Sequence, residues 1–202
     1  MKLPSDHAGS NHPINNLFLA LLPEGQGGPE VNGLGQQQKV KHSLTGKLLG
    51  LPRYHVSLHS FGNFPYIPSG LVSAIGEVFA PLAAATEPFP VCFDRAGTFD
   101  TRQSKLPFVL RSSAINKALM KFFRKLGAYV RGRRTTFTPH VTLLYDAKNV
   151  LEQPVNPVGW MVSKLVLVRS YVGLGQHEHL AHWPLLGKSS GSMQMDLPLD
   201  FN

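Results

Sequence analysis

The sequence predicts an α+β domain, on three observations. Hydrophobic residues make up 43% of the 202 residues and charged residues only 16%, so the chain can bury a sizeable core and is not disordered throughout. The 19 glycines and 16 prolines indicate many turns, which favours a fold with strands over a helical bundle. Segments with the apolar spacing of helices lie between several short strand-like segments, a pattern typical of α+β or α/β domains.

Strands are expected at seven places. The clearest is 53–59, where apolar and polar residues alternate with the period of two of a half-buried strand. The others are 16–22, 89–99, 106–111, 138–145, 160–169 and 180–186. Residues 24–37 are rich in Gly and Gln and have little apolar periodicity, so we expect a loop that leads into a short helix ending near residue 42.

Two longer helices are expected. The first covers 69–85, with Ser69 as its N-cap and with Pro81 expected to kink or shorten it. The second runs from Ser112 or Ser113 to residue 126, where Gly127 is expected to end it in the left-handed conformation. Their buried faces are predicted to consist of Leu71, Ile75, Val78, Phe79 and Leu82 in the first and Ile115, Leu119, Phe122 and Leu126 in the second.

Net charge and cysteine content limit the classes of function. With 20 Lys and Arg against 12 Asp and Glu, the net charge is +8, which suits a polyanionic or phosphorylated partner, although solubility alone explains it equally well. The one cysteine, Cys92, excludes an intrachain disulfide and a zinc site of paired cysteines, and makes a cytoplasmic location the default. No apolar run approaches the roughly 18 residues that cross a bilayer, and the N-terminus lacks the apolar segment of a signal peptide, so no membrane partner is expected.

Two short motifs carry the chemistry. Each consists of His, an aliphatic residue, a hydroxyl residue and another aliphatic residue: His55-Val-Ser-Leu58 and His140-Val-Thr-Leu143. Alternate side chains of a strand share a face, so His55 should lie beside Ser57 and His140 beside Thr142, with the aliphatic residues in a core behind them. Because the same device occurs twice, we expect two related half-domains that each supply one strand to a shared cleft.

A pair of imidazoles and a pair of hydroxyls suit acid–base chemistry at a phosphodiester. Unperturbed histidine has a pKa of about 6.5, so one ring can accept a proton while the other donates one. The hydroxyls of Ser57 and Thr142 can hydrogen-bond to non-bridging phosphoryl oxygens. A ribose 2′,3′-cyclic phosphate fits such a site, because the attacking water and the leaving ribose oxygen lie on opposite sides of phosphorus, and no metal is required.

Metal binding is the competing use of these rings. Residues four apart in a strand are about 13 Å apart, so His55 and His59 cannot wrap around one ion, and no carboxylate lies near them in the sequence. We expect His59 to line the edge of the cleft or to pack as an ordinary histidine. His177, His179 and His182 resemble a loose metal cluster but lack a supporting carboxylate pattern, so no metal or other cofactor is predicted.

The motifs and their surroundings resemble the two-histidine (2H) phosphoesterase superfamily, and within it the 2′-5′ RNA ligase family, also called RNA 2′,3′-cyclic phosphodiesterases. The first motif of that family lies in a segment like His-Val-Thr-Leu-His-Phe-Leu-Gly, which is similar to His55-Val-Ser-Leu-His-Ser-Phe-Gly62. The second resembles Phe-x-Pro-His-Val/Ile-Thr-Leu, and this chain has Phe137-Thr-Pro-His-Val-Thr-Leu143. The likeness covers about residues 16–187. Ser57 replaces the commoner Thr and retains the hydroxyl.

The resemblance implies a fold of two α+β lobes related by a pseudo-twofold axis. Each lobe is an antiparallel-rich sheet with helices on the outside, and the active-site cleft lies between the lobes. One bilobal domain then covers 15–187, between a flexible leader at 1–14 and a flexible tail at 188–202. A monomer is expected.

The resemblance also implies an activity and the roles of four residues. The reaction is hydrolysis of a 2′,3′-cyclic phosphate, at an RNA end or on a small cyclic nucleotide, to a 2′-phosphate; some relatives also join RNA ends through 2′-5′ bonds in vitro. His55 is then the acid and His140 the base, an order that the near symmetry of the site leaves open. Ser57 and Thr142 bind the phosphate.

Four further residues are candidate substrate contacts. Arg133 and Arg134 close the densest basic run and lead directly into the second motif, so they can guide an RNA backbone, although a solvated basic surface explains the run as well. Phe61 and Tyr145 can stack a base, with packing in the core or at the rim as an equal alternative.

Two alternatives to the predicted activity stay open. One is a two-histidine enzyme that acts on another small cyclic phosphate, such as ADP-ribose 1″,2″-cyclic phosphate, or on a 2′-5′ linkage. The other is a non-catalytic RNA-binding module of the same fold, against which the presence of all four motif residues argues.

Overall fold

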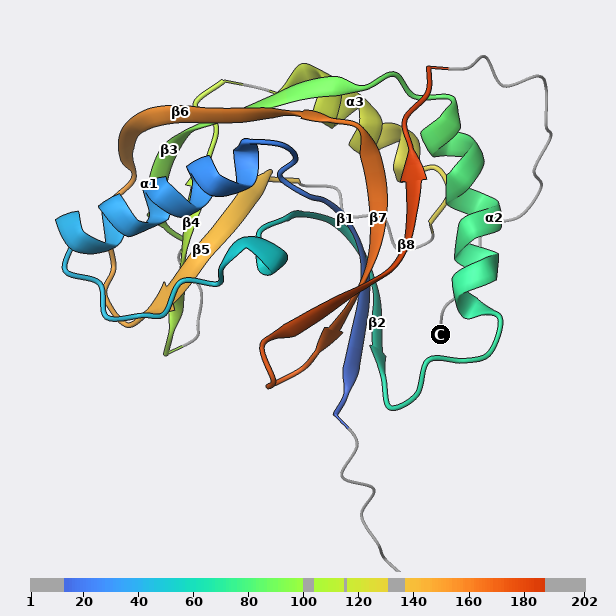
Figure 1. The fold of residues 1–202 in the computed structure, drawn as a ribbon, viewed down its shortest axis with the longest axis horizontal. Coiled ribbons are helices and arrows are strands. Elements are labelled where there is room, and N and C mark those ends of the chain that lie inside the picture. The colour runs from blue at the N-terminus through green and yellow to red at the C-terminus, as the bar shows by residue number, and fades with distance from the viewer. Residues whose placement is uncertain (1–12, 100–103, 115, 131–136, 188–202) are drawn as a thin grey trace, which may run out of the picture.

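Two four-stranded antiparallel sheets form the two halves of the molecule, with helices packed on them (Figure 1). The computed structural model describes residues 13–99, 104–114, 116–130 and 137–187. The first sheet has the order β2-β1-β7-β8 and consists of β1 (Asn15–Leu21), β2 (Val56–Phe64), β7 (Lys164–Tyr171) and β8 (Gln176–Pro184). The second has the order β5-β4-β3-β6 and consists of β3 (Phe89–Thr98), β4 (Leu106–Arg111), β5 (His140–Asp146) and β6 (Gln153–Val162). The predicted α+β fold of two antiparallel lobes is confirmed.

The two sheets repeat one arrangement around the motif strands. The strand that begins at or just after a motif histidine, β2 or β5, lies at one edge of its sheet and pairs with a single neighbour, β1 or β4. The backbones of β2 and β5 approach each other across the gap between the sheets. The strand expected at 53–59 begins later, at Val56, because Leu51–Arg53 forms a turn of 3-10 helix.

The strand expected at 160–169 is in fact two strands, one in each sheet. The chain leaves the second sheet at Val162 and enters the first at Lys164, with Ser163 between them. Both strands are apolar and no glycine or proline separates them, so the sequence pattern is continuous across the break. The carboxylate of Glu24 fixes the crossing, because it accepts hydrogen bonds from the Ser163 backbone N–H, at 2.9 Å, and from the Ser163 hydroxyl.

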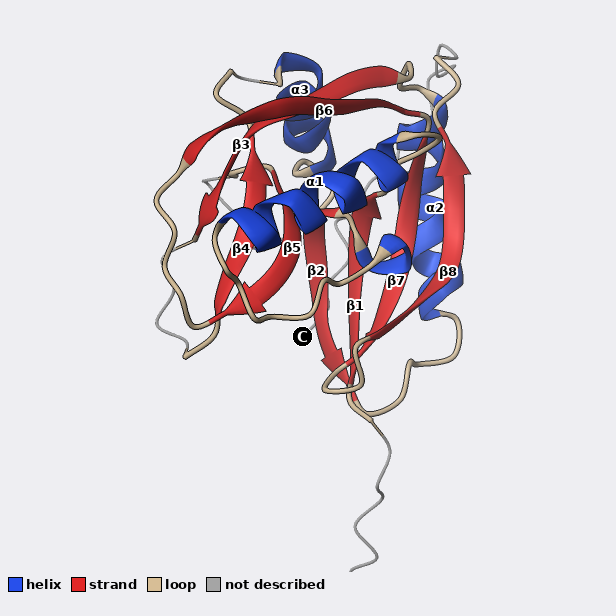
Figure 2. Cartoon of the chain, turned by 60° about the vertical axis from the view of Figure 1, so that its left-hand side comes forward, coloured by secondary structure: helices blue, strands red, loops and turns tan. Residues whose placement is uncertain are grey.

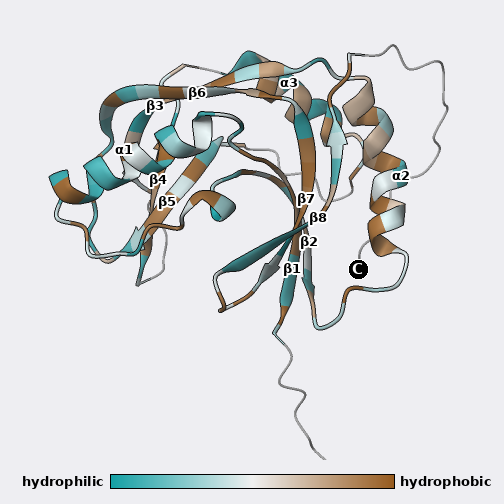
Figure 3. Ribbon diagram, in the orientation of Figure 1, coloured by the Kyte–Doolittle hydropathy of each residue, from teal (hydrophilic) through white to brown (hydrophobic). Residues whose placement is uncertain are grey.

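The core explains why β1 is apolar on both faces. Leu17, Leu19 and Leu21 are fully buried in the main core, which extends into both sheets and all three α-helices. The alternate residues, Phe18 and Ala20, pack with side chains of β7 on the other face. In Figure 3, β7 is mostly hydrophobic while α1 is largely hydrophilic. Phe18 belongs to this small apolar cluster and lines the hollow on the side of the first sheet that faces the second.

Helix α1 (Gly27–Lys41) occupies most of the segment expected to be a loop, so the loop was wrong, whereas the expected helix end near residue 42 is confirmed. Its glycines allow close packing: a Cβ on Gly27 would lie 2.9 Å from Cβ of Trp160, and one on Gly35 would lie 3.1 Å from the Leu48 side chain. The helix packs against β5 and β6, as Figure 2 shows from the side. The residues that resemble turn formers in the sequence thus serve helix–sheet contact.

Helices α2 (Leu71–Ala84) and α3 (Lys117–Leu126) confirm the two other predicted helices, with corrections at their ends. Gly70, with φ of 81°, caps α2 in place of Ser69, and Pro81 lies inside the helix, which continues to Ala84. Helix α3 starts later than expected, at Lys117, and the backbone N–H of Ser113 before it bonds to Asp94 at 2.6 Å. Gly127 keeps a right-handed φ of −62°, so the expected left-handed end was wrong.

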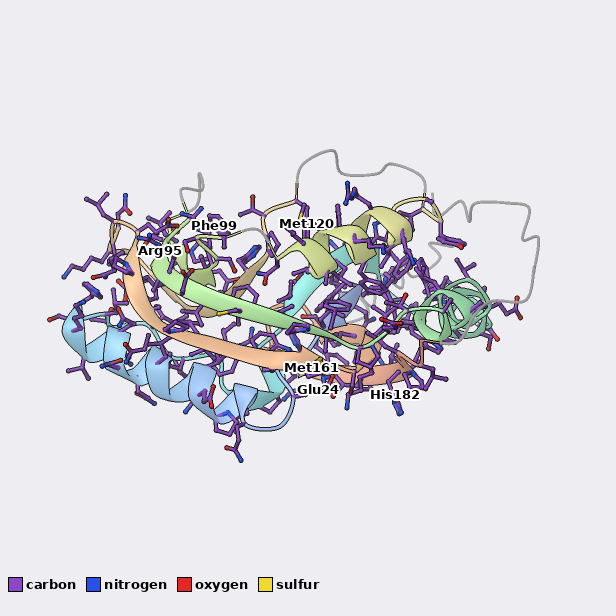
Figure 4. All side chains as sticks on the ribbon, turned by 90° about the horizontal axis from the view of Figure 1, so that it is seen from above. Glu24, Arg95, Phe99, Met120, Met161 and His182 are labelled. Carbon is purple, nitrogen blue, oxygen red and sulfur yellow. The ribbon has the colours of Figure 1, made fainter. Side chains whose placement is uncertain are left out.

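The helices pack on the sheets, α2 on β8, α1 on β5 and β6, and α3 on β3. Seen from above in Figure 4, α1 and α3 lie on opposite sides of the strand pair β3–β6. The buried stripe of α3 contains Leu119, Phe122 and Leu126 as predicted, while Ile115 lies outside the described residues. Among the described residues, no helix has the length and apolar character needed to span a bilayer.

Asp146, at the end of β5, joins the loop before the first motif to the strand of the second. Its buried carboxylate accepts hydrogen bonds from the backbone N–H groups of Thr45 and Gly46, each at 2.7 Å, and of Lys148 at 2.9 Å. Gly46 is required at this contact, because a Cβ there would lie 2.1 Å from the carbonyl oxygen of Tyr145. The hydrogen bonds, first of all that from Lys148, hold the pKa of Asp146 below its ordinary value of 3.8.

We expect Asp146→Asn to lower the free energy of unfolding by about 2–3 kcal/mol at pH 7, since charge-assisted hydrogen bonds to buried donors are lost. Because the folded pKa of Asp146 is depressed, its contribution is present above pH 3.8 and declines as the pH falls through the folded value. Chemical denaturation should therefore give a smaller difference at pH 3 than at pH 7. The exposed Glu77→Gln is the control and should change little. An equal loss at both pH values would contradict the assignment.

Candidate active site

A cavity of about 530 Å³ opens between the two sheets, and both motifs line it. His55 and Ser57 reach it from the start of β2, and His140 and Thr142 from the start of β5. The aliphatic residues between them point the other way into the core, where Val56 is 1% exposed and Val141 is fully buried. The four predicted residues are thus brought together, although the two motifs are far apart in the chain.

The same hydrogen bond holds each motif histidine. Nδ1 of His55 lies 2.7 Å from the carbonyl oxygen of Arg53, and Nδ1 of His140 lies 2.9 Å from that of Thr138. A carbonyl oxygen can only accept, so Nδ1 carries the hydrogen in both rings. The lone pair of each neutral ring is therefore on Nε2, and the ring cannot flip without losing its bond. Both neutral rings therefore have the same tautomer, and both line one cavity.

Aromatic contacts support both rings. The His55 ring lies 4.9 Å, centroid to centroid, from Phe18 and 5.4 Å from His177, whereas the His140 ring meets the edge of Phe99 at 4.7 Å. Burial, with a smaller effect from the charge of His140, lowers the pKa of His55 to about 4, although the hydrogen bond that Nδ1–H donates to the Arg53 carbonyl acts in the opposite direction. His55 is therefore neutral at pH 7 when the cavity holds no anion.

His177 is a third histidine at the cavity. It lies on β8, and burial and the neighbouring His55 together lower its pKa to about 4. In the sequence it resembles part of a loose cluster with His179 and His182, but neither of these two lines the cavity. Figure 4 shows His182 well away from Phe99, the ring that contacts His140. Among the described residues, no three His, Cys, Asp or Glu side chains form a group that could hold a metal.

The cavity has one permanent cation, Arg53, and no carboxylate among the described residues that line it. Four histidines also line it: His55, His59, His140 and His177. Asn16 and Ser170 add polar groups from β1 and β7. The charge of Arg53 attracts an anion of phosphate size, and the hydroxyls of the lining serines and threonine can hydrogen-bond to its oxygens.

The remaining predicted contacts have different outcomes. Tyr145 lines the cavity and is 41% exposed, so it is accessible to a ligand. Phe61 is only 5% exposed and packs against His59 and Phe79 in the core. Its ring is therefore not accessible to a base, and the prediction of Phe61 as a substrate contact was wrong. Arg133 and Arg134 lie outside the described residues.

Arg53 and His177 are site residues that the sequence interpretation missed. Arg53 lies two residues before His55, at the end of the short 3-10 turn, and this closeness in sequence was an available signal. His177 had no such signal, because its place beside His55 depends on the pairing of β1 with β7 and of β7 with β8. Such pairing across more than a hundred residues cannot be read from local periodicity.

Comparison with known proteins supports the same fold. A family model described as the 2'-5' RNA ligase superfamily matches residues 29–173, which include both motifs. The structure is similar to LigT of Escherichia coli bound to NADP+, with a TM-score of 0.66 and 20% identity over 86% of this chain and 99% of LigT. LigT bound to 3′-AMP gives a TM-score of 0.64 and 21% identity over 85% and 98% of the two chains.

A third structure agrees. TT0787 of Thermus thermophilus is similar with a TM-score of 0.62 and 20% identity, over 86% of this chain and 100% of that protein. At such identities these likenesses show a shared fold. No curated protein matches the chain in sequence.

The hydrogen-bond geometry predicts the nitrogen chemical shifts of the two motif rings. In long-range ¹H–¹⁵N spectra at pH 7, His55 should show the Nδ1–H tautomer, and the His55 titration should have its midpoint near pH 4, because burial disfavours the imidazolium. Inorganic phosphate should raise that midpoint, since an anion in the cavity stabilises the charged ring. His55→Ala assigns the signal. An Nε2–H tautomer, or a midpoint that phosphate does not move, would contradict the described site.

Proposed function

Because this chain belongs to the 2′-5′ RNA ligase superfamily of two-histidine phosphoesterases, we propose that it is a metal-independent RNA 2′,3′-cyclic phosphodiesterase. One observation carries the proposal: His55 and His140, each held through Nδ1, line one cavity from two different sheets. Phosphoryl displacement needs a base and an acid on opposite sides of phosphorus. Two rings on separate walls supply such a pair.

The proposed reaction uses only groups of this chain and water. Nε2 of one ring takes a proton from water as its oxygen attacks phosphorus, and the P–O3′ bond breaks. The other ring gives its proton to the departing 3′-oxygen. The products are a 2′-phosphate and a free 3′-hydroxyl, and the two rings end with exchanged protonation states, which solvent resets. The same step with the 5′-hydroxyl of a second RNA in place of water would form a 2′-5′ phosphodiester and release the 3′-hydroxyl, so in vitro ligation needs no further group.

The hydroxyls of Ser57 and Thr142 and the guanidinium of Arg53 would bind the phosphate. Ser57 and Thr142 lie two residues after the histidines, on the same strand faces, and can donate to non-bridging oxygens. Preorganised donors of this kind stabilise charge that builds up in the transition state. Each motif would thus supply one proton-transfer group and one phosphate ligand.

Acid and base roles depend on how the substrate changes the pKa of His55. The ring is neutral in the absence of an anion, which is the form of a base. The assignment of His55 as acid and His140 as base therefore requires that the bound phosphate raise the pKa of His55 towards neutrality. Without such a rise, the opposite order is the consistent one.

The family and the fold favour a nucleotide substrate. The superfamily acts on RNA and nucleotides, and the LigT structure with 3′-AMP holds a ribonucleotide monophosphate in that protein. A cavity of about 530 Å³ with no carboxylate among its described lining residues suits a nucleoside phosphate. A monomeric state and a cytoplasmic location stay predictions.

The proposal predicts that purified protein converts a short RNA ending in a 2′,3′-cyclic phosphate to the 2′-phosphate, in EDTA as well as without it. His55→Ala and His140→Ala should each lower kcat by roughly 10² or more, and Ser57→Ala by less. The double histidine variant should be little worse than either single one, because the two rings act as a unit. Chromatography that resolves 2′- from 3′-phosphate measures the outcome.

His182→Ala is the matched control, since this exposed histidine does not line the cavity, and it should retain full activity. Unchanged turnover in either motif variant would refute two-histidine catalysis. Loss of activity in EDTA would point to a metal enzyme. Binding of the RNA without any turnover would favour the non-catalytic module.

A further inference from the structure

Arg53 lines the histidine cavity and has no counter-ion among the residues that the structure describes. It makes no ion pair with any of the described residues, and its Nε is buried without a hydrogen-bond partner. Its guanidinium lies under the turn between β7 and β8, where a Cβ on Gly175 would be 3.3 Å from Nη1. A buried donor on a charged group is costly unless an acceptor completes it.

The surface around Arg53 extends beyond the histidine cavity. Arg53 and Tyr145 line that cavity and also a second, more open depression, whose other described residues are Ser104, Lys105, Gly173 and Gly175. The two hollows are thus contiguous and share these two side chains. The second one also has no carboxylate among its described residues and has two cations, Arg53 and Lys105.

Main-chain geometry places this second hollow next to the reacting group. The carbonyl of Arg53 holds His55 through Nδ1, so the cation and the ring are fixed to one short stretch of chain. The glycines of the β7–β8 turn have φ of 84° at Gly173 and 65° at Gly175, and they leave the approach to Arg53 clear of side chains. Tyr145 offers an exposed ring between the two hollows.

We infer that Arg53 and Lys105 form a second phosphate subsite, which binds a phosphate group attached to the 5′-oxygen of the nucleotide whose cyclic phosphate lies between His55 and His140. This inference rests on the proposed function and names its substrate class: nucleotides with a further phosphate on the 5′ side. An internal RNA phosphodiester and a 5′-monophosphate share this chemistry. Arginine suits such a group because its planar donors match two phosphate oxygens.

Binding of product-like ligands tests the subsite without any need for turnover. By calorimetry, adenosine 2′,5′-bisphosphate should bind roughly tenfold or more tightly than adenosine 2′-monophosphate, as expected for one charge-assisted contact. Arg53→Gln and Lys105→Gln should each reduce this ratio, and higher salt should do the same. The dinucleotide ApA with a terminal 2′-phosphate is the third ligand: a gain with it identifies an RNA diester, and a gain with the bisphosphate alone identifies a 5′-monoester.

The ratio of the bisphosphate and monophosphate affinities distinguishes the subsite from a structural effect, because damage to the fold or to His55 would weaken the binding of all three ligands together. Lys117→Gln, at an exposed lysine that lines neither hollow, is the charge-matched control and should leave the ratio unchanged. Equal affinity of the unmodified protein for 2′-monophosphate and 2′,5′-bisphosphate would overturn the inference.

Hydrolysis of adenosine 2′,3′-cyclic phosphate, which has no second phosphate, distinguishes the two proposals. If the protein hydrolyses this substrate but binds the monophosphate and the bisphosphate equally well, the subsite is refuted and the proposed function is supported. A protein that prefers the bisphosphate but hydrolyses none of the cyclic substrates would support the subsite and refute the proposed function.

Discussion

The hydrogen bond from Nδ1 of each motif histidine to a carbonyl two residues earlier is the constraint on which the site depends. It fixes the tautomer of both rings and directs the chemistry of each to Nε2. It also ties each ring to the chain just before its motif, at Arg53 in the first and at Thr138 in the second. Because the bond is local, each half of the molecule fixes the orientation of its own histidine without contacts from the other half.

The rest of the fold brings these two prepared rings to one cavity. Each motif begins an edge strand, and the crossing from β6 to β7, tied by Glu24 at Ser163, joins one sheet to the other. Asp146 adds a second tie, from the end of β5 to the loop at Thr45 and Gly46. The Asp146 contact lies on β5 itself, the strand that carries His140, so it helps to hold that ring in place.

Local patterns determined how much of this could be predicted. Period-two alternation with aliphatic residues identified the motif strands and the faces of His55 and His140, because that signal lies within a few residues. Helix α1 was missed because Gly27 and Gly35 serve close packing against side chains that are distant in sequence. His177 joins the site only through the pairing of β1, β7 and β8, and Phe61 is buried by packing against Phe79 on α2, so neither position followed from its neighbours.

The central claim is that two imidazoles from different sheets act on one phosphorus. Its most direct test is a crystal structure of the protein with orthovanadate and a nucleoside, which together mimic the five-coordinate transition state. The account predicts Nε2 of His55 and Nε2 of His140 each at about 2.6–3.2 Å from a different oxygen of the same vanadium, with both Nδ1 bonds retained. A vanadate that contacts only one of the two rings, or a ring turned so that Nδ1 faces the ligand, would contradict it.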